Sequence, residues 1–189
     1  MELQKNKQVE GRFANRPSIL EQKKFRSMAR KTKPTQSHLV GIISDTHGLV
    51  RPEAIKALRG VELILHAGDV GAPEVLTALQ TIAPVYSVRG NVDREDWARN
   101  LPKARAIEVG RYMLYLLHDL HSLDLDPAAA GFRAIISGHS HHPYTEQRNG
   151  VLYLNPGSAG PRRFRLPVSV ALLKIEGDFS EARLVELKV

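Results

Sequence analysis

The sequence contains no cysteine. That absence excludes disulfide bonds, thiolate metal sites and cysteine nucleophiles, and it fits a reducing compartment. Any metal must therefore be bound by histidine, by carboxylates or by asparagine. The chain also lacks an apolar stretch of about 18 residues, the length that a membrane-spanning helix needs, and its N-terminus lacks the apolar region of a signal peptide. We expect a soluble, cytoplasmic protein with no membrane partner.

The net charge of +7 lies entirely in the first 37 of the 189 residues. That segment holds ten Lys or Arg against three Glu, whereas the rest of the chain holds 17 residues of each sign. Because the segment is also poor in apolar residues, we predict that residues 1–37 form a mostly disordered basic leader. Residues 38–189 are expected to form one folded domain. A basic tail can bind nucleic acid, although such tails are more often solvated without a specific partner.

The first part of the predicted domain repeats a unit of apolar strand, polar loop and amphipathic helix. We predict strands at 39–44, 61–65 and 84–88, and helices at 52–58 and 73–79. Each helix has a proline in its first turn, where the missing N–H costs nothing. Three such units predict a parallel sheet with right-handed crossovers, and they place the three polar loops along one edge of that sheet.

The second part of the domain has shorter apolar runs separated by Gly, Asn and Pro. We predict a hairpin of 104–109 with 112–117, a short Ala-rich helix at 126–130 and a buried strand at 134–137. The closing segments 144–147, 151–154, 169–175 and 182–187 are predicted to be antiparallel strands of a second sheet.

Five of these apolar runs end in polar residues that can bind a metal through an oxygen or an imidazole nitrogen. They are Asp45 and His47, Asp69, Asn91, His118, and His139 with His141. Any one of them could be a helix cap, a turn residue or a core histidine, but those roles do not explain the conjunction. Seven oxygen or imidazole ligands are too many for one ion, whereas two divalent metals about 3.5–4 Å apart, bridged by one carboxylate, would use them all. Mixed imidazole and carboxylate ligands suit Mn, Fe, Co, Ni or Zn better than Mg or Ca.

The order and spacing of these motifs resemble the calcineurin-like metallophosphoesterases, and among them the small YfcE/MJ0936-type phosphodiesterases of bacteria and archaea. The motifs that carry the resemblance are Asp45-x-His47, Gly68-Asp69, Gly90-Asn91-Val92-Asp93, His118, Gly138-His139-Ser140-His141, Asn155-Pro156-Gly157-Ser158 and Pro161-Arg162. They cover the chain from residue 39 onward and leave the leader unexplained. The resemblance implies an α/β fold of two mixed β-sheets packed face to face and flanked by helices, a four-layer sandwich.

The resemblance also implies roles for the predicted ligands. One metal would be bound by Asp45, His47, Asp69 and His141, and the other by Asp69, Asn91, His118 and His139, so that Asp69 is the bridge. The implied reaction is hydrolysis of a small phosphodiester by a hydroxide that bridges the two metals. We expect manganese, with nickel, iron, cobalt and zinc as alternatives, and we expect catalysis to depend on Asp69, Asn91 and His139.

Two positions depart from the family's pattern. Asp119 stands where many relatives have glycine, and the nearby His121 could replace His118 as the ligand, although His118 directly ends its apolar run. Val92 stands where larger phosphoesterases of the superfamily have a histidine that stabilises the transition state or protonates the leaving group. The small branch typically lacks that histidine too, and its absence favours diesters and good leaving groups over unactivated monoesters.

Residues around the predicted ligands are expected to support them. His66 and His142 would orient ligands or have no role, and residues 155–158 would shape the wall of the pocket. Asp93 would cap the helix that follows it. The two arginines at 162 and 163 would either reach a phosphate or remain solvated.

Two other functions fit the same residues. The retromer subunit Vps29 resembles this fold and is a protein-binding scaffold whose metal pocket has drifted. Retention of all seven ligand side chains favours an enzyme over such a scaffold. The basic leader could also be a nucleic-acid anchor that delivers the active site to RNA ends or cyclic nucleotides. The sequence leaves open whether the chain forms homo-oligomers.

Overall fold

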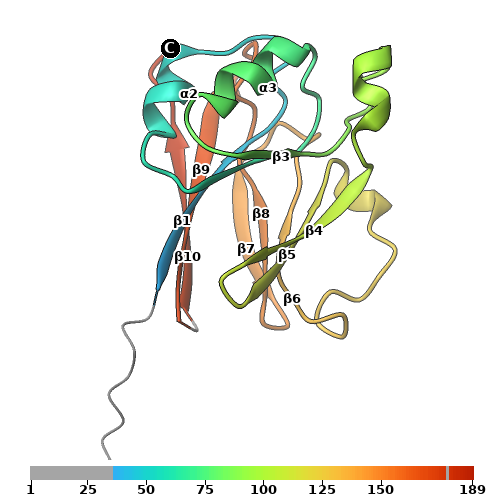
Figure 1. Cartoon of the computed structure of the whole chain (residues 1–189), viewed down its shortest axis with the longest axis vertical. Helices are drawn as coiled ribbons and strands as arrows, with labels where there is room; N and C mark the ends of the chain where they lie inside the picture. The colour runs from blue at the N-terminus through green and yellow to red at the C-terminus, as the bar shows by residue number, and fades with distance from the viewer. Residues whose placement is uncertain (1–35, 178) are drawn as a thin grey trace, which may run out of the picture. The chain divides into compact units, whose positions relative to one another are not determined.

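The computed structural model describes residues 36–177 and 179–189. The predicted leader therefore lies outside the described residues, apart from Gln36 and Ser37. The described chain forms two five-stranded sheets of mixed strand direction, which pack face to face (Figure 1). The predicted sandwich of two mixed sheets is confirmed.

The first sheet has the strand order β10-β9-β1-β2-β3. Its strands are β1 (Ser37–Ile43), β2 (Leu63–His66), β3 (Val85–Ser87), β9 (Ser169–Glu176) and β10 (Phe179–Glu186). Strands β1, β2 and β3 are parallel, as predicted, and helices α2 (Pro52–Ala57) and α3 (Pro73–Gln80) connect them. The polar loops after these three strands therefore do lie on one edge.

The assignment of the last two strands to the second sheet is wrong. Strand β9 pairs antiparallel with β1, and β10 pairs with β9, so both extend the first sheet. The side chains of β9 alternate between the core that separates the sheets and the layer beneath the helices, with Leu173 in the former and Val170 in the latter. A strand that is apolar on both faces fits either sheet, so the pattern of its own residues does not name its neighbours.

The second sheet has the strand order β4-β5-β6-β8-β7. Its strands are β4 (Ala104–Val109), β5 (Tyr112–Leu117), β6 (Phe132–Ile136), β7 (Tyr144–Arg148) and β8 (Val151–Asn155). The predicted hairpin of β4 with β5 is confirmed, and β7 is antiparallel to β8, but β6 is parallel to both β5 and β8. The ends of β5 and β6 therefore lie on the same edge, which allows the residues after both strands to meet.

The Ala-rich helix predicted at 126–130 is wrong. One helical turn forms there, closed by a 3.0 Å hydrogen bond from Ala130 N to Asp126 O. The side chain of Asp126 accepts hydrogen bonds from the N–H groups of Ala128 and Ala129, which satisfies the turn locally. Gly131, with φ of 79°, then reverses the backbone and ends it.

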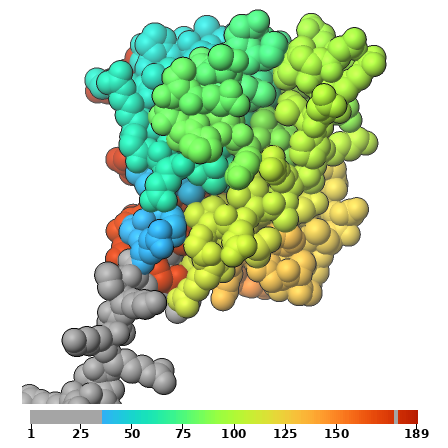
Figure 2. Space-filling view, in the orientation of Figure 1, coloured from blue at the N-terminus to red at the C-terminus, as the bar shows by residue number. Residues whose placement is uncertain are grey.

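The main core lies between the two sheets. Its buried side chains include Val40, Ile42, Leu65, Leu114, Leu116, Ile136, Leu154 and Leu173. The outer face of the first sheet is covered by α2 and α3, through Leu58 and Leu79 among others; in Figure 2 the cyan-to-green segment that holds both helices covers the upper part of the visible face. The outer face of the second sheet carries a smaller cluster, to which the short 3-10 helix η2 (Leu120–Ser122) contributes Leu120.

None of the helices in the described residues is long and apolar enough to cross a membrane.

The loops after β1 and β2 continue the pairing of their strands. Backbone hydrogen bonds of 2.8–3.0 Å join Asp45 N to Gly68 O, His47 N to Asp69 O and Gly48 N to Val70 O. The two loops are thus paired along their length, and their polar side chains are held by backbone bonds on both sides.

Asp93 ties a third loop to this pair. Its carboxylate is buried and accepts hydrogen bonds from the N–H groups of Val70, Gly71 and Gly90 at 2.8–3.2 Å. The prediction that Asp93 caps the following helix is wrong, because that element is the 3-10 helix η1 (Asp96–Asn100), which begins after Glu95 without a side-chain cap. A carboxylate that satisfies three loop N–H groups instead holds the loop after β3 against the loop after β2.

His66 is a buried polar residue at the end of β2. Its Nε2 lies 2.9 Å from Thr46 Oγ1, and because that hydroxyl donates its hydrogen to Val70 O, the Nε2–H of His66 must donate to Thr46. His66 Nδ1 has no hydrogen-bond partner among the described residues. Burial lowers the pKa of His66 to about 4, against the opposing effect of the Asp45 and Asp93 carboxylates. His66 is therefore a neutral histidine that holds Thr46 in place.

His66 should make the fold sensitive to acid. Its pKa falls from 6.5 in the unfolded chain to about 4 in the fold, so between these values the unfolded state binds more protons. The free energy of unfolding therefore drops as pH falls from 6.5 to 4, by on the order of 3 kcal/mol for the whole shift. In His66→Gln, which retains an N–H donor, this part of the pH dependence should disappear. Denaturant unfolding in chelator at pH 7 and pH 5 measures it, and an unchanged pH dependence would contradict it.

Candidate metal centre

The seven predicted ligands follow strands of both sheets. Asp45 and His47 follow β1, Asp69 follows β2, Asn91 follows β3, His118 follows β5, and His139 and His141 follow β6. All seven side chains meet at this edge of the sandwich and form two contiguous groups, which share carboxylates.

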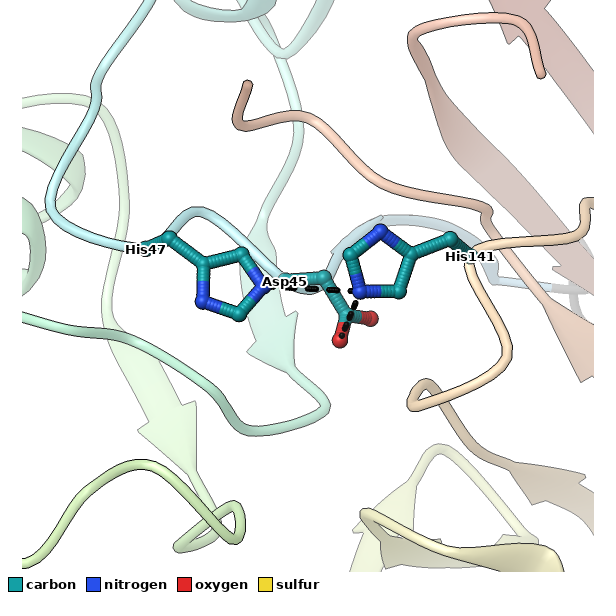
Figure 3. Close-up of side chains that lie close together, drawn as sticks. All are labelled: Asp45, His47 and His141. Atoms are coloured by element: carbon teal, nitrogen blue, oxygen red, sulfur yellow. Dashed lines mark hydrogen bonds and ion pairs between the residues drawn. The ribbon is translucent and has the colours of Figure 1, made fainter. Parts of the chain in front are cut away.

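The first group contains Asp45, His47 and His141 (Figure 3), whose ligand atoms all lie within 4.8 Å of one another. His141 Nε2 is 3.2 Å from Asp45 Oδ1 and 3.4 Å from His47 Nε2. The two imidazole rings are stacked, with centroids 5.3 Å apart. Three ligand atoms from loops almost a hundred residues apart therefore face one small volume.

Two buried atoms of this group, Asp45 Oδ1 and His141 Nδ1, have no hydrogen-bond partner in the described part of the chain, and the nitrogen that faces Asp45 Oδ1 is His141 Nε2 at 3.2 Å. The other oxygen of the carboxylate, Asp45 Oδ2, accepts from Ser44 Oγ at 2.5 Å and from His139 N at 3.1 Å. A buried carboxylate oxygen without a hydrogen bond is costly. The residues present therefore fit a cation that Asp45 Oδ1 would bind.

The second group contains Asp45, Asp69 and His118, again with ligand atoms within 4.8 Å of one another. Asn91 and His139 extend it: Asn91 Oδ1 lies 3.0 Å from His118 Nε2 and 3.0 Å from His139 Nδ1. The amide oxygen thus lies between two imidazole nitrogens, an arrangement that a shared cation would satisfy.

His118 presents the nitrogen that a metal needs. Its Nδ1 lies 2.7 Å from the carbonyl oxygen of Ala67, so Nδ1 carries the proton and the lone pair of Nε2 faces the group. The side chain of His121 is 95% exposed and lies beside Asp119, with Nδ1 3.1 Å from Oδ1. The structure thus places His118 in the cluster and His121 outside it.

Asp69 lies between the two groups. Its Oδ1 is 3.4 Å from His118 Nε2 and accepts a hydrogen bond from Val92 N, and its Oδ2 is 4.0 Å from His47 Nε2. Burial alone would raise the pKa of Asp69, but its contact with His118, the hydrogen bond from Val92 N and the charges of His118 and His47 lower it. A carboxylate held ionised between two sets of imidazoles is suited to bind a cation through each oxygen.

The pKa values of His47 and His118, one from each group, are shifted in opposite directions. Burial lowers the pKa of His47, partly offset by the Asp69 and Asp45 carboxylates. Burial also acts to lower the pKa of His118, but its contacts with Asp69 and Ala67 O outweigh burial and raise it. His118 is thus the imidazole most tightly coupled to Asp69.

Five of the seven side chains stand on left-handed backbone. Their φ angles are 54° for Asp45, 48° for His47, 52° for Asp69, 67° for His139 and 59° for His141. Such conformations cost of order 1–3 kcal/mol each in non-glycine residues and are concentrated at functional sites. Hydrogen bonds from behind the loops hold this backbone, because Ser158 Oγ donates to Asp45 O and Asn155 Nδ2 donates to Gly138 O.

Two glycines leave room for the carboxylates. A Cβ on Gly90 would overlap the carboxylate of Asp69, and a Cβ on Gly138 would overlap Ser44 Oγ and lie 2.8 Å from Asp45 Oδ2. Each glycine is thus required by a close approach of backbone to a ligand.

Several residues around the ligands have contacts that the sequence did not specify. Asn155 and Ser158 hold the backbone of two ligand loops, by the hydrogen bonds described above. His142 is exposed. Ser44 was not anticipated, since a serine at the end of a strand carries no signal of its own. Arg163 extends toward the site, with Nη2 3.5 Å from His47 Nε2.

Comparison with known proteins agrees with this geometry. Residues 39–178 match the calcineurin-like phosphoesterase superfamily domain. A probable metallophosphoesterase of Methanothermobacter thermautotrophicus is 39% identical over 159 residues, which cover 78% of this chain and 91% of that protein. The phosphodiesterase MJ0936 of Methanocaldococcus jannaschii is 26% identical over 137 residues, which cover 62% of this chain and 82% of the relative.

Solved structures share the fold. An archaeal phosphodiesterase superposes with a TM-score of 0.67 at 23% identity, covering 79% of this chain and 99% of its own. Vps29 of Cryptosporidium parvum superposes with a TM-score of 0.65 at 20% identity, covering 80% and 98%.

The family domain spans most of the described chain, and a relative named as a probable metallophosphoesterase is similar over 78% of the chain. The chain therefore belongs to the calcineurin-like phosphoesterase superfamily, as its motifs predicted, and is a metallophosphoesterase.

Proposed function

We propose that this protein is a metal-dependent phosphodiesterase whose seven ligands bind two divalent cations. The first cation would be held by Asp45, His47, Asp69 and His141, and the second by Asp69, Asn91, His118 and His139. The observation that carries the proposal is the position of Asp69, which turns one carboxylate oxygen toward each group of histidines. Asp45 is a poorer bridge, because Ser44 and His139 N already occupy its Oδ2.

Two divalent cations, when bound, supply an activated water for attack on phosphorus and neutralise charge on the phosphoryl oxygens. The protein's own residues orient the substrate around them. With its Oδ1 turned toward the imidazoles, Asn91 has its amide N–H groups available for a phosphoryl oxygen. Arg163, whose guanidinium lies beside His47, can hold another phosphoryl oxygen on the opposite side.

The proposed substrate class depends on whether residue 92 can donate a proton to the leaving group. Val92 is 43% exposed and its N–H is used by Asp69, so the position offers the leaving group no acid. A leaving group that departs without a protein proton donor must be stable as an anion. This supports a diester with a good leaving group as the substrate.

The donor set also supports a choice of metal. Imidazole with carboxylate and amide oxygen suits manganese, and nickel, iron, cobalt and zinc fit the same ligands. We propose manganese in a cytoplasmic enzyme, a location that the cysteine-free sequence fits.

A non-catalytic scaffold is the competing function, because Vps29 has a similar fold. The two functions differ in what they require of the site. A scaffold needs neither a buried carboxylate oxygen left without a hydrogen bond nor five strained ligand residues, and both are present here. These features support the enzyme.

Metal reconstitution tests the proposal. Protein stripped of metal and reloaded with Mn, Ni, Zn or Mg should hydrolyse bis(4-nitrophenyl) phosphate best with Mn. It should hydrolyse 4-nitrophenyl phosphate more slowly. Asp69→Ala and His139→Ala should each lower kcat/KM at least about 100-fold, because loss of a ligand costs more than the 10–100-fold typical of an outer partner.

His121→Ala is the matched control, since that side chain is exposed outside the cluster. It should retain the activity of the wild type. Full activity in Asp69→Ala, or equal losses in His121→Ala and His139→Ala, would rule out the proposed centre.

Substitution at position 92 tests the role of the leaving group. Val92→His introduces an acid beside Asp69, so it should raise kcat for a phenyl diester, a poor leaving group, by about tenfold, below the 10²–10⁴ of an optimised acid. Hydrolysis of the 4-nitrophenyl diester should change little. Val92→Gln, which adds bulk without an acid, is the control; a gain with Gln as large as with His would refute the explanation.

The basic leader supports a second proposal, that residues 1–37 bind nucleic acid. All of the net charge lies there, and each phosphate neutralised on a single strand adds about −0.7 to the slope of log K against log salt. Full-length protein should bind single-stranded RNA with a steep salt dependence that is lost when residues 1–35 are deleted. Equal binding by the two proteins, measured by salt titration, would remove this role.

A further inference from the structure

The loop at 159–167 is closed at its base. Ser158 and Val168 form a parallel bridge, and Ser169 N donates to Ser158 O at 2.9 Å. Prolines at 161 and 167 stiffen the segment between. The residues at the tip are therefore presented on a constrained loop.

The base of this loop is fastened to the metal centre. Arg51 donates from Nε and Nη2 to Gly160 O at 3.3 and 3.2 Å. Gly160 lies so close to the loop after β1 that a Cβ there would be 2.5 Å from the carbonyl oxygens of both Asp45 and Thr46. The tip of the loop therefore begins next to the backbone that carries Asp45.

The tip carries three arginines and one aromatic residue in succession. Arg162, Arg163, Phe164 and Arg165 are all exposed, and Phe164 is 93% exposed. Within the described residues none of these arginines forms an ion pair, and Arg163 Nη2 is 3.5 Å from His47 Nε2. An exposed ring flanked by unpaired cations is the composition of a surface that binds nucleotides.

The backbone of Phe164 is unfavourable for a bulky residue. A 3.1 Å hydrogen bond from Leu166 N to Arg163 O closes a β-turn, in which Phe164 is the first central residue with φ of 53°. Arg165 is not among the residues with positive φ, so the turn is of the II′ kind, which favours glycine at this position. Neither burial nor turn preference explains a phenylalanine here.

We propose that Arg163 and Phe164 form a nucleoside phosphate subsite, in which Arg163 binds the phosphate at the metal centre and Phe164 stacks on the base. This rests on the proposed diesterase function and narrows its substrates to phosphodiesters that carry a nucleoside. Adjacent Cα atoms lie about 3.8 Å apart, so Arg163 and Phe164 are close enough for one nucleoside phosphate to contact both. Stacking accepts any base, because every base has a π-face.

Binding tests the subsite without catalysis. Calorimetric titration of the full-length protein, with Mn²⁺ present, would compare adenosine 5′-monophosphate with ribose 5-phosphate. The wild type should bind the nucleotide about 5- to 150-fold more tightly, the range of one base stacked on an aromatic ring. Phe164→Ala should abolish that preference and leave the affinity for ribose 5-phosphate unchanged.

Two further variants distinguish the loss of the aromatic ring from a change in the stability of the fold. Phe164→Tyr keeps an aromatic ring and should keep the preference. Phe164→Gly suits the turn and should lose the preference without lowering Tm. Equal affinity of the wild type for both phosphates, a preference that survives in Phe164→Ala, or no binding of either phosphate would overturn the proposal.

A kinetic pair distinguishes this proposal from the diesterase itself. Adenosine 5′-(4-nitrophenyl) phosphate and ethyl 4-nitrophenyl phosphate share a leaving group and differ in the nucleoside. Phe164→Ala should lower kcat/KM for the nucleoside ester alone. If the wild type hydrolyses both esters equally well, the subsite is wrong and the diesterase stands; if it hydrolyses neither but prefers the nucleotide in binding, the diesterase is wrong and the subsite stands.

Discussion

The position of one carboxylate, Asp69, organises this site. It lies between imidazoles from both sheets, with His47 from the first and His118 from the second. Its place depends on Gly90, which has no Cβ to collide with it, and on Val92 N, which donates to it. Because the residues on either side come from different sheets, the site exists only where the two sheets are packed together.

The loops that carry the ligands are strained, and neighbouring polar groups hold them. Left-handed backbone at five ligand positions is unfavourable for side chains of this size. Asp93 binds three N–H groups of the loops after β2 and β3, and Asn155 and Ser158 hold the loops after β6 and β1. These residues contribute by fixing the backbone positions from which the ligand side chains extend.

Much of the architecture follows from local pattern. The three parallel strands and their helices were predictable because each apolar run has a length, a proline and a polar end that mark it. The neighbours of β9 were not, because a strand that is apolar on both faces fits either sheet; β10 pairs antiparallel with β9, so its sheet is set by that of β9. Asp93 shows the same limit at a single residue: the sequence next to it suggests a helix cap, whereas the N–H groups it binds belong mainly to a loop over twenty residues away.

The sequence by itself determined the chemistry available to this protein: no thiolate, seven oxygen or imidazole side chains at strand ends, and the motif order of a phosphoesterase. Residue type and spacing are properties of the chain and need no coordinates. Only the tertiary structure decided which atoms face one another, that His118 rather than His121 enters the cluster, and that Arg163 lies beside His47 while Phe164 is exposed. Those outcomes depend on contacts between segments far apart in the chain, and such contacts are set by packing rather than by any local pattern.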